Sequence, residues 1–371
     1  MASTAPRRFQ SILIFLFAAF VLVPRFAAAS DLTVFIEKRE AVFHIRAVSA
    51  FDTISFAIEP RAGFTEKMVR IYEMIGVRQE EGGTLEKVGD FMGQQVRTVR
   101  SLLPFWKDEG KNKETDAQSS EADTLNRLLD EAGALLFSPM EAQLAIAKSV
   151  DFVIDAESLF YSFDALHFGN EPLFLKKDVS YRFSEEKTAT PKASASWRGL
   201  IIADEDTDPE KGAEAVSVLF PGAFGFDADT VQPKDIESIS SADFILISAE
   251  GGVDGLQVKH MVLRPQTLSR LKPELVYLDC NLYGLNLNFI NHFKQVGVSA
   301  YVAPVFGRWT GKDSAQTMIR FFRAMLNGEN PSRSLYLARK TLYDASILNG
   351  EDVLTAMRIA FPFRLYQFGK Q

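Results

Sequence analysis

The sequence predicts an α/β fold: a mostly parallel β-sheet flanked by helices on both faces, preceded by an antiparallel meander with helices. The first observation is that short apolar strands alternate with helical segments over residues 134–371. The second is that these strands, such as RGLIIAD (198–204), are apolar at nearly every position, as is typical of parallel strands buried on both faces. The third is that apolar residues alternate with other residues over 31–48, which indicates strands with one buried face.

The first part of the chain reads as three short strands and then helices. Residues 31–48 contain two strands, and residues 51–59 form a third. Helical spacing of apolar residues follows. A segment between the later helices, residues 107–123, is polar throughout and reads as a surface loop. The expected helices cover residues 65–76, 84–103 and 125–136.

The second part alternates strands and helices, with a second polar loop at 184–196. The expected strands are 151–155, 198–204, 242–250, 274–280, 299–305 and a closing strand at 363–368. The expected helices are 208–220, 267–271, 285–296, 313–327 and 331–343.

Composition narrows the classes of function. The 371 residues are 47% hydrophobic and 24% charged, the balance of a globular protein with a large core. The net charge of −7 argues against a protein that coats nucleic acid. One Cys and four His do not make a closed structural zinc site of the usual kind, and a lone Cys forms no internal disulfide. We therefore predict no metal and no cofactor.

The N-terminus has the pattern of an export signal. Arg7 and Arg8 precede twelve apolar residues, ILIFLFAAFVLV (12–23), and Ala27 and Ala29 form a small-residue cleavage site. Twelve residues span about 18 Å as a helix, against about 30 Å of hydrocarbon, so an uncleaved membrane anchor is the less favoured alternative. We predict a signal peptide over 1–29 and a mature bacterial protein that is periplasmic or secreted, with no stable membrane span.

Polar side chains follow the predicted buried strands. Ligands of an open α/β sheet bind outside the carboxyl ends of its strands, which directs attention to Asp204, to Glu250 with the glycines after it, and to Cys280 with Asn281. A nucleophilic Cys needs a nearby base, usually His. None of the four histidines falls at the carboxyl end of a predicted strand: they are His44, His167, His260 and His292.

Two other patterns at these strand ends are weak. Asp204, Asp206 and Asp208 have the alternate spacing of a calcium loop but lack its glycine and distal glutamate. Gly251 and Gly252 follow a strand without the continuation of a phosphate-binding fingerprint. A solvated loop explains the aspartates better, and we give the glycine pair no phosphate role.

The residues of several segments, and the order of these segments, resemble the CHAT domain, a caspase- and separase-like family of the caspase–haemoglobinase fold. ADFILISAEGG (242–252) resembles the family's "A-D-I-L-H-I-A-C-H-G", and ELVYLDCNLYG (274–284) resembles its "D-L-V-V-L-S-A-C-E-T-G". Four further segments resemble the family in the same order: 134–184, 199–223, 296–342 and 361–369. The resemblance implies a caspase-like domain over 134–371, preceded by an N-terminal meander and helices over 30–133.

This resemblance also implies a catalytic His–Cys dyad, and the sequence departs from it. Matching Gly251 to the family's glycine puts Glu250 at the His position. An ungapped match of the later motif puts Asn281 at the nucleophile position and Cys280 one residue early. A carboxylate, whose pKa is ordinarily about 4.3, is a poor proton acceptor from a thiol with a pKa of about 8.5.

The sequence therefore predicts a degenerate cysteine peptidase fold that binds a peptide or a partner protein without cleaving it. Its groove would include Asp204, Gly251 and Gly252. The alternative is an active cysteine endopeptidase with Cys280 as nucleophile and an unidentified base. A third possibility is an exported interaction module without a functional groove.

Overall fold

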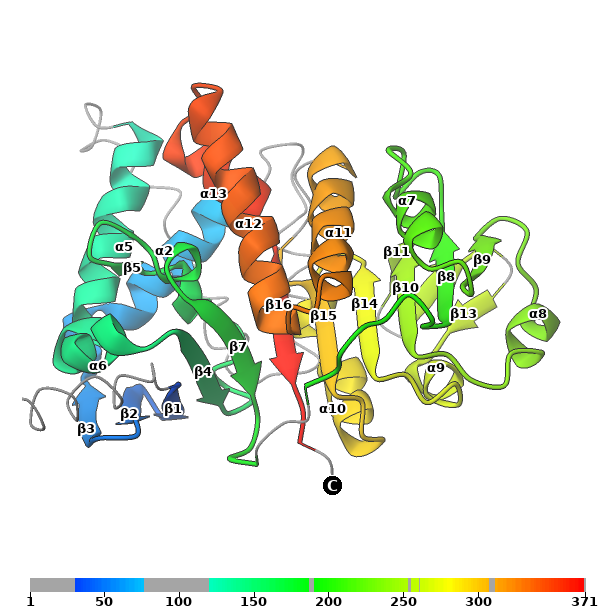
Figure 1. Ribbon diagram of the computed structural model, residues 1–371. Coiled ribbons are helices and arrows are strands. Elements are labelled where there is room, and N and C mark those ends of the chain that lie inside the picture. The colour runs from blue at the N-terminus through cyan, green and yellow to red at the C-terminus, as the bar shows by residue number, and fades with distance from the viewer. Residues whose placement is uncertain are drawn as a thin grey trace, which may run out of the picture.

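A computed structural model describes residues 31–76, 120–186, 190–252, 255–259, 261–306 and 311–369. The predicted signal peptide (1–29), the predicted helix 84–103 and most of the predicted loop 107–123 lie outside these ranges. Within these described ranges, one sheet of eleven strands crosses the molecule, with helices packed along it (Figure 1). This sheet, and the antiparallel strands at its start, confirm the predicted fold class.

The strands of the large sheet run in two directions. β1, β4, β7 and β16 are parallel to one another, and so are β15, β14, β10, β8 and β9. The two sets meet antiparallel at β15 and β16. In spatial order the strands are β3 (Thr53–Ile58), β2 (Val42–Val48), β1 (Leu32–Arg39), β4 (Ser149–Ile154), β7 (Asp178–Arg182), β16 (Phe363–Gln367), β15 (Ala300–Pro304), β14 (Leu275–Asp279), β10 (Phe244–Ser248), β8 (Gly199–Ala203) and β9 (Phe224–Asp227).

The helices follow the predicted segments closely where the structure describes them. Among the described residues, two small sheets accompany the large one: β5 (His167–Phe168) with β6 (Glu171–Pro172), and β11 (Glu250–Gly251) with β12 (Leu256–Val258) and β13 (Met261–Leu263). The α-helices are α2 (Phe64–Gly76), α5 (Glu121–Phe137), α6 (Glu141–Ile146), α7 (Gly212–Leu219), α8 (Pro233–Glu237), α9 (Pro265–Ser269), α10 (Leu287–Gln295), α11 (Gly311–Leu326), α12 (Pro331–Leu348) and α13 (Val353–Ala360).

Two hydrophobic cores lie on the two faces of the central strands. Along β10, Phe244 and Leu246 point to one core, and Ile245 and Ile247 point to the other, because side chains alternate along a strand. The first core is closed by α7, α11 and α12, and the second by helices that include α9 and α10. Because both faces are buried, the central strands are apolar at nearly every position.

The meander has a core on one face only. Leu32, Val34 and Ile36 of β1 are buried beneath α2 and α5, while the residues between them are less buried or exposed. This one-sided burial explains the alternating pattern of residues 31–48. β1 pairs with β4, so the meander belongs to the same sheet as the later strands, and the predicted boundary at 133/134 falls inside α5.

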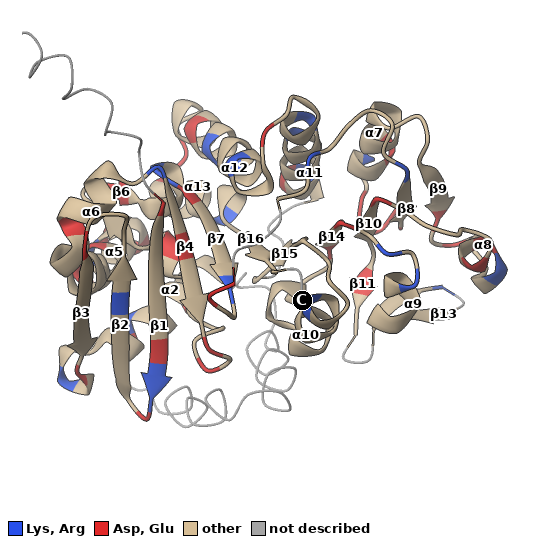
Figure 2. Cartoon of the chain, turned by 60° about the horizontal axis from the view of Figure 1, so that its bottom comes forward, with Lys and Arg blue, Asp and Glu red and all other residues tan. Residues whose placement is uncertain are grey.

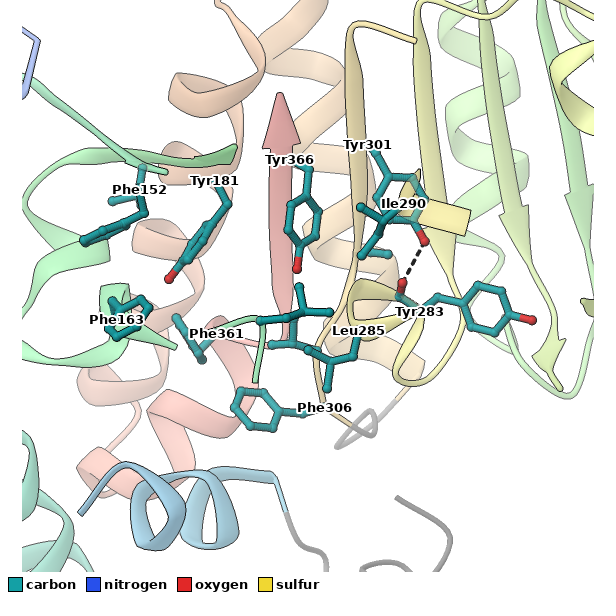
Figure 3. Packing of buried hydrophobic residues seen from close by; sticks show 14 of the residues in the cluster. Phe152, Phe163, Tyr181, Tyr283, Leu285, Ile290, Tyr301, Phe306, Phe361 and Tyr366 are labelled. Atoms are coloured by element: carbon teal, nitrogen blue, oxygen red, sulfur yellow. Dashed lines mark hydrogen bonds between the residues drawn. The ribbon is translucent and has the colours of Figure 1, made fainter. Parts of the chain in front are cut away.

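A row of aromatic side chains joins the two halves of the sheet. Phe152, Tyr181, Tyr366 and Tyr301 stand on four successive strands, β4, β7, β16 and β15, and face the same core (Figure 3). The ring centroids of neighbours lie 5.3, 6.1 and 6.1 Å apart. These contacts pack the strands across the point where their direction reverses.

Some elements differ from the sequence prediction. β7, β9, β12 and β13 were not expected as strands, and α8 and α13 were not expected as helices. The predicted strand 242–250 is divided between β10 and β11. The polar loop ends earlier than predicted, because Ser120 and Asp123 form a capping box that starts α5 at Glu121. Among the described residues, no helix has the length and apolar character needed to cross a membrane.

Candidate functional site

The predicted site lies at the carboxyl ends of three neighbouring strands. β10 lies between β8 and β14, and Ser248 at its end is the register partner of Ala203 on one side and of Asp279 on the other. Asp204, Cys280 and Asn281 follow directly from these strand ends, and Glu250 follows two residues after β10. The fold therefore brings these predicted site residues to one edge of the sheet.

Cys280 is buried beneath this edge. Its exposed fraction is 0%, and its Sγ donates a hydrogen bond to the carbonyl oxygen of Ile247 at 3.8 Å. The thiol belongs to the core that also contains Leu278, two residues earlier on the same face of the strand. Asn281, the next residue, is exposed. The residue that the sequence resemblance matches to a nucleophile thus reaches solvent, and the thiol does not.

Glu250 lies in a different environment from the thiol. It is exposed and begins β11, where its register partner is Gln257 of β12. Ala249, the residue before it, is fully buried. A carboxylate in solvent is suited to binding a cation and not to removing a proton from a buried thiol.

Each described histidine either contacts another side chain or lies far from β14. His44 is exposed on β2, six strand positions from β14, or about 29 Å at the usual strand spacing. His167 Nδ1 lies 2.7 Å from Asp130 Oδ1 of α5. His292 Nε2 lies 2.9 Å from the hydroxyl of Ser269, and burial lowers its pKa. His260 lies outside the described residues.

A buried carboxylate at the same edge was not predicted from the sequence. Asp279 is 1% exposed and accepts hydrogen bonds from the hydroxyls of Ser248, at 3.0 Å, and of Ser314. The Thr207 hydroxyl lies 3.3 Å from that of Ser248. The cluster ties the ends of β10 and β14 to the first turn of α11 and to the loop after β8. Its signal in the sequence is a single Asp at the end of an otherwise apolar strand.

The two weak patterns have structural roles. Asp208 caps α7, because its two carboxylate oxygens accept hydrogen bonds from the backbone N–H groups of Gly212 and Ala213, each at 2.8 Å. Asp204 Oδ1 accepts from the backbone N–H of Asp206 at 2.8 Å. Within the described ranges, no group of three or more His, Cys, Asp or Glu side chains is placed to hold a metal ion.

The glycine pair enters a strand and not a phosphate-binding turn. Gly251 pairs with Leu256 in the small sheet, and the backbone N–H of Gly252 donates to the carbonyl of Gly255 at 2.9 Å. A phosphate-binding loop would lead into a helix N-terminus. Gly251 instead allows a close approach, because a Cβ atom built on it would lie 2.2 Å from the ring of Tyr283.

Acidic residues surround a cavity beside β8. The cavity has a volume of about 280 Å³ and lies between α7 and β9. Figure 2 shows acidic residues at the end of β9 and on β11 at this edge. Lys211 also lines the cavity, but its amine lies 3.7 Å from the Glu214 carboxylate. The acidic side chains lining the cavity are Asp204, Glu205, Asp208, Glu214 and Asp227.

Comparisons with known proteins were made on the sequence and on the fold. No model of a known protein family matches the chain, and no curated protein matches it either. Among solved structures, the chain is similar to the Arg-specific cysteine proteinase gingipain R, with a TM-score of 0.43 and 10% sequence identity over 64% of this chain and 68% of that chain. The resemblance to the CHAT family stays a prediction from the sequence motifs.

Proposed function

We propose that the mature chain is a non-catalytic, caspase-like binding protein that holds an extended peptide or protein segment at the carboxyl edge of β8, β10 and β14. The observation that carries this proposal is the burial of Cys280 beside an exposed Asn281 and an exposed Glu250. A nucleophilic thiol must be accessible and must have a base or a cation beside it. Cys280 does not meet the first condition, because its exposed fraction is 0%.

The charge of the edge supports a ligand with basic side chains. The cavity at the end of β8 is lined by Asp204, Glu205 and Asp227, and Glu250 is exposed on the adjoining segment. A Lys or Arg side chain is long enough to enter a cavity of this size and carries the opposite charge. The site would then recognise one basic side chain of an extended segment and leave the peptide bonds of that segment intact.

The binding proposal predicts which peptides a random library yields. Selection of displayed dodecapeptides on the mature protein should enrich Lys and Arg. The affinity of the enriched peptides, measured by fluorescence anisotropy, should fall by about tenfold with Glu205→Lys and by about as much with Glu250→Lys. This is the change expected for the loss of one favourable charge contact. Glu351→Lys, at an exposed position in the loop before α13, is the matched control and should leave the affinity unchanged.

Two outcomes would overturn the binding proposal. One is the absence of enrichment after selection. The other is an equal loss of affinity for Glu351→Lys, which would indicate a nonspecific effect of the net charge. Cleavage of the bound peptides would favour the alternative, an active endopeptidase with Cys280 as nucleophile. An exported interaction module without a groove is the third candidate, and it predicts no selected peptides.

Export is part of the same proposal. The charged n-region, the twelve-residue apolar segment and the alanines before Ser30 are its support. Residues 1–29 contain three arginines and no acidic residue, so their removal takes the net charge from −7 to −10. Expressed in a bacterium, the protein should appear in the periplasm or the medium with Ser30 at its N-terminus. Recovery of the full-length chain in the membrane fraction, measured by intact mass, would contradict this.

A further inference from the structure

Tyr283 connects the two segments that follow β10 and β14. It lies in the loop after Cys280, and its exposed fraction is 0%. Its hydroxyl donates a hydrogen bond to the carbonyl oxygen of Gly252 at 2.8 Å. Its ring covers Gly251, where an added Cβ atom would lie 2.2 Å from ring carbon Cε2. One side chain therefore joins the segment after β14 to the segment after β10.

The backbone of the same loop is fixed from the other side. Tyr301 of β15 donates its hydroxyl to the carbonyl oxygen of Tyr283 at 2.8 Å (Figure 3). Tyr366 of β16 donates its hydroxyl to the carbonyl oxygen of Gly284 at 2.5 Å. Burial raises the pKa of both hydroxyls, so they stay protonated and continue to donate. Gly284 fits closely against β15, since a Cβ atom there would lie 2.7 Å from the carbonyl oxygen of Ala303.

These contacts give the loop an asymmetric design. Its backbone is held by β15 and β16, which lie in the middle of the sheet. Through Tyr283, the loop also contacts the neighbouring segment at the short two-residue strand β11. This contact at Gly251 and Gly252 consists of a hydrogen bond and a ring contact, whereas the loop backbone is held by hydrogen bonds from two central strands. Motion at this edge should therefore begin where Tyr283 meets the glycines.

We propose that Tyr283 is a latch that holds the 250–252 segment against the 280–284 loop and keeps the Cys280 thiol covered. Tyr283 acts as a positioning residue for these two segments. The latch lies at the strand edge of the proposed function, but its existence does not depend on a ligand.

Two substitutions should release the latch by different means. Tyr283→Phe keeps the ring and removes the hydrogen bond to Gly252. Gly251→Ala keeps the hydroxyl and adds the methyl group that overlaps the ring. Both should accelerate alkylation of Cys280 by iodoacetamide by about tenfold, the factor that corresponds to one buried hydrogen bond. Both should also accelerate amide hydrogen exchange over 244–252, measured by mass spectrometry.

Tyr161→Phe is the matched control. Tyr161 is 1% exposed, and its hydroxyl accepts a hydrogen bond from the Lys38 amine at 2.9 Å in the other half of the sheet. This variant loses the buried hydrogen bonds of that hydroxyl with Lys38 and Thr65, so it measures how far a general loss of stability exposes the thiol. The latch predicts alkylation within about twofold of the wild type for Tyr161→Phe and no change in exchange over 244–252.

The proposal is overturned if Tyr283→Phe and Gly251→Ala alkylate no faster than Tyr161→Phe, because the thiol would then be exposed only by global unfolding. It is also overturned if exchange over 244–252 is unchanged in both. These measurements use the mature protein without any peptide. Failure of the latch is therefore distinguishable from failure of the binding proposal, which the peptide titrations test.

Discussion

The purified mature protein should cleave no member of a broad peptide library, and its Cys280 should alkylate slowly. The thiol is 0% exposed and donates to the carbonyl of Ile247, so a reagent reaches it only after the surrounding segment opens. Opening free energies of a few kcal/mol reduce the rate by about 100-fold or more. Cleavage is measured by mass spectrometry of the library, and alkylation by mass shift.

A thiol at the adjacent position provides the control for this prediction. Asn281 is exposed, so Asn281→Cys in a Cys280→Ala background places a thiol in solvent one residue further along. This variant should alkylate about 100-fold faster than the wild type. Turnover of any peptide that disappears on Cys280→Ala would refute the prediction and support the endopeptidase alternative.

The second prediction concerns a buried ion pair beside Tyr181 of β7. Asp164 and Arg339 are 1% and 3% exposed, and Arg339 Nη1 donates to Asp164 Oδ2 at 3.0 Å. Tyr181 donates its hydroxyl to the other carboxylate oxygen at 2.6 Å. Asp164→Asn should lower the free energy of unfolding by about 3–5 kcal/mol, because it leaves the guanidinium of Arg339 buried without its counter-charge. Urea unfolding followed by circular dichroism measures the loss.

A half-exposed pair serves as the comparison. Asp178 accepts from Arg333 Nη1 at 3.1 Å, and the Arg333 side chain is 39% exposed. Asp178→Asn should lower the free energy of unfolding by about 1 kcal/mol or less. Replacing the buried pair together, as Asp164→Leu with Arg339→Met, should cost less than Asp164→Asn alone. Equal losses for Asp164→Asn and Asp178→Asn would show that burial does not determine the cost.

The sequence carried enough information for the fold class because the two kinds of strand differ in pattern. β1 alternates since one face lies in solvent, whereas β10 and β14 are apolar at most positions since helices cover both faces. The stripe of Met68, Ile71, Tyr72 and Ile75 predicted α2 because all four side chains face the core. β9 could not be predicted from its pattern: it lies at the sheet edge, and its four residues include an exposed glycine.

The candidate site could be predicted in position but not in detail. Strand ends located Asp204, Glu250 and Cys280, because parallel strands place their carboxyl ends at one edge. The burial of Cys280 could not be predicted from periodicity, since a strand that is apolar on both faces does not indicate which core each side chain enters. The Asp279 cluster and the Tyr283 contact with Gly251 join residues more than thirty positions apart, so local patterns do not reveal them.

The most direct test of the account is labelling of the mature protein with a biotinylated peptidyl acyloxymethyl ketone, a thiol-reactive peptide inhibitor with a basic residue at the position next to the reactive group. The account predicts that the inhibitor leaves Cys280 unlabelled, as read by intact mass, although the peptide portion binds reversibly at the acidic edge. Stoichiometric labelling of Cys280 that is abolished by Cys280→Ala would contradict it, because only an accessible and activated thiol reacts in this way.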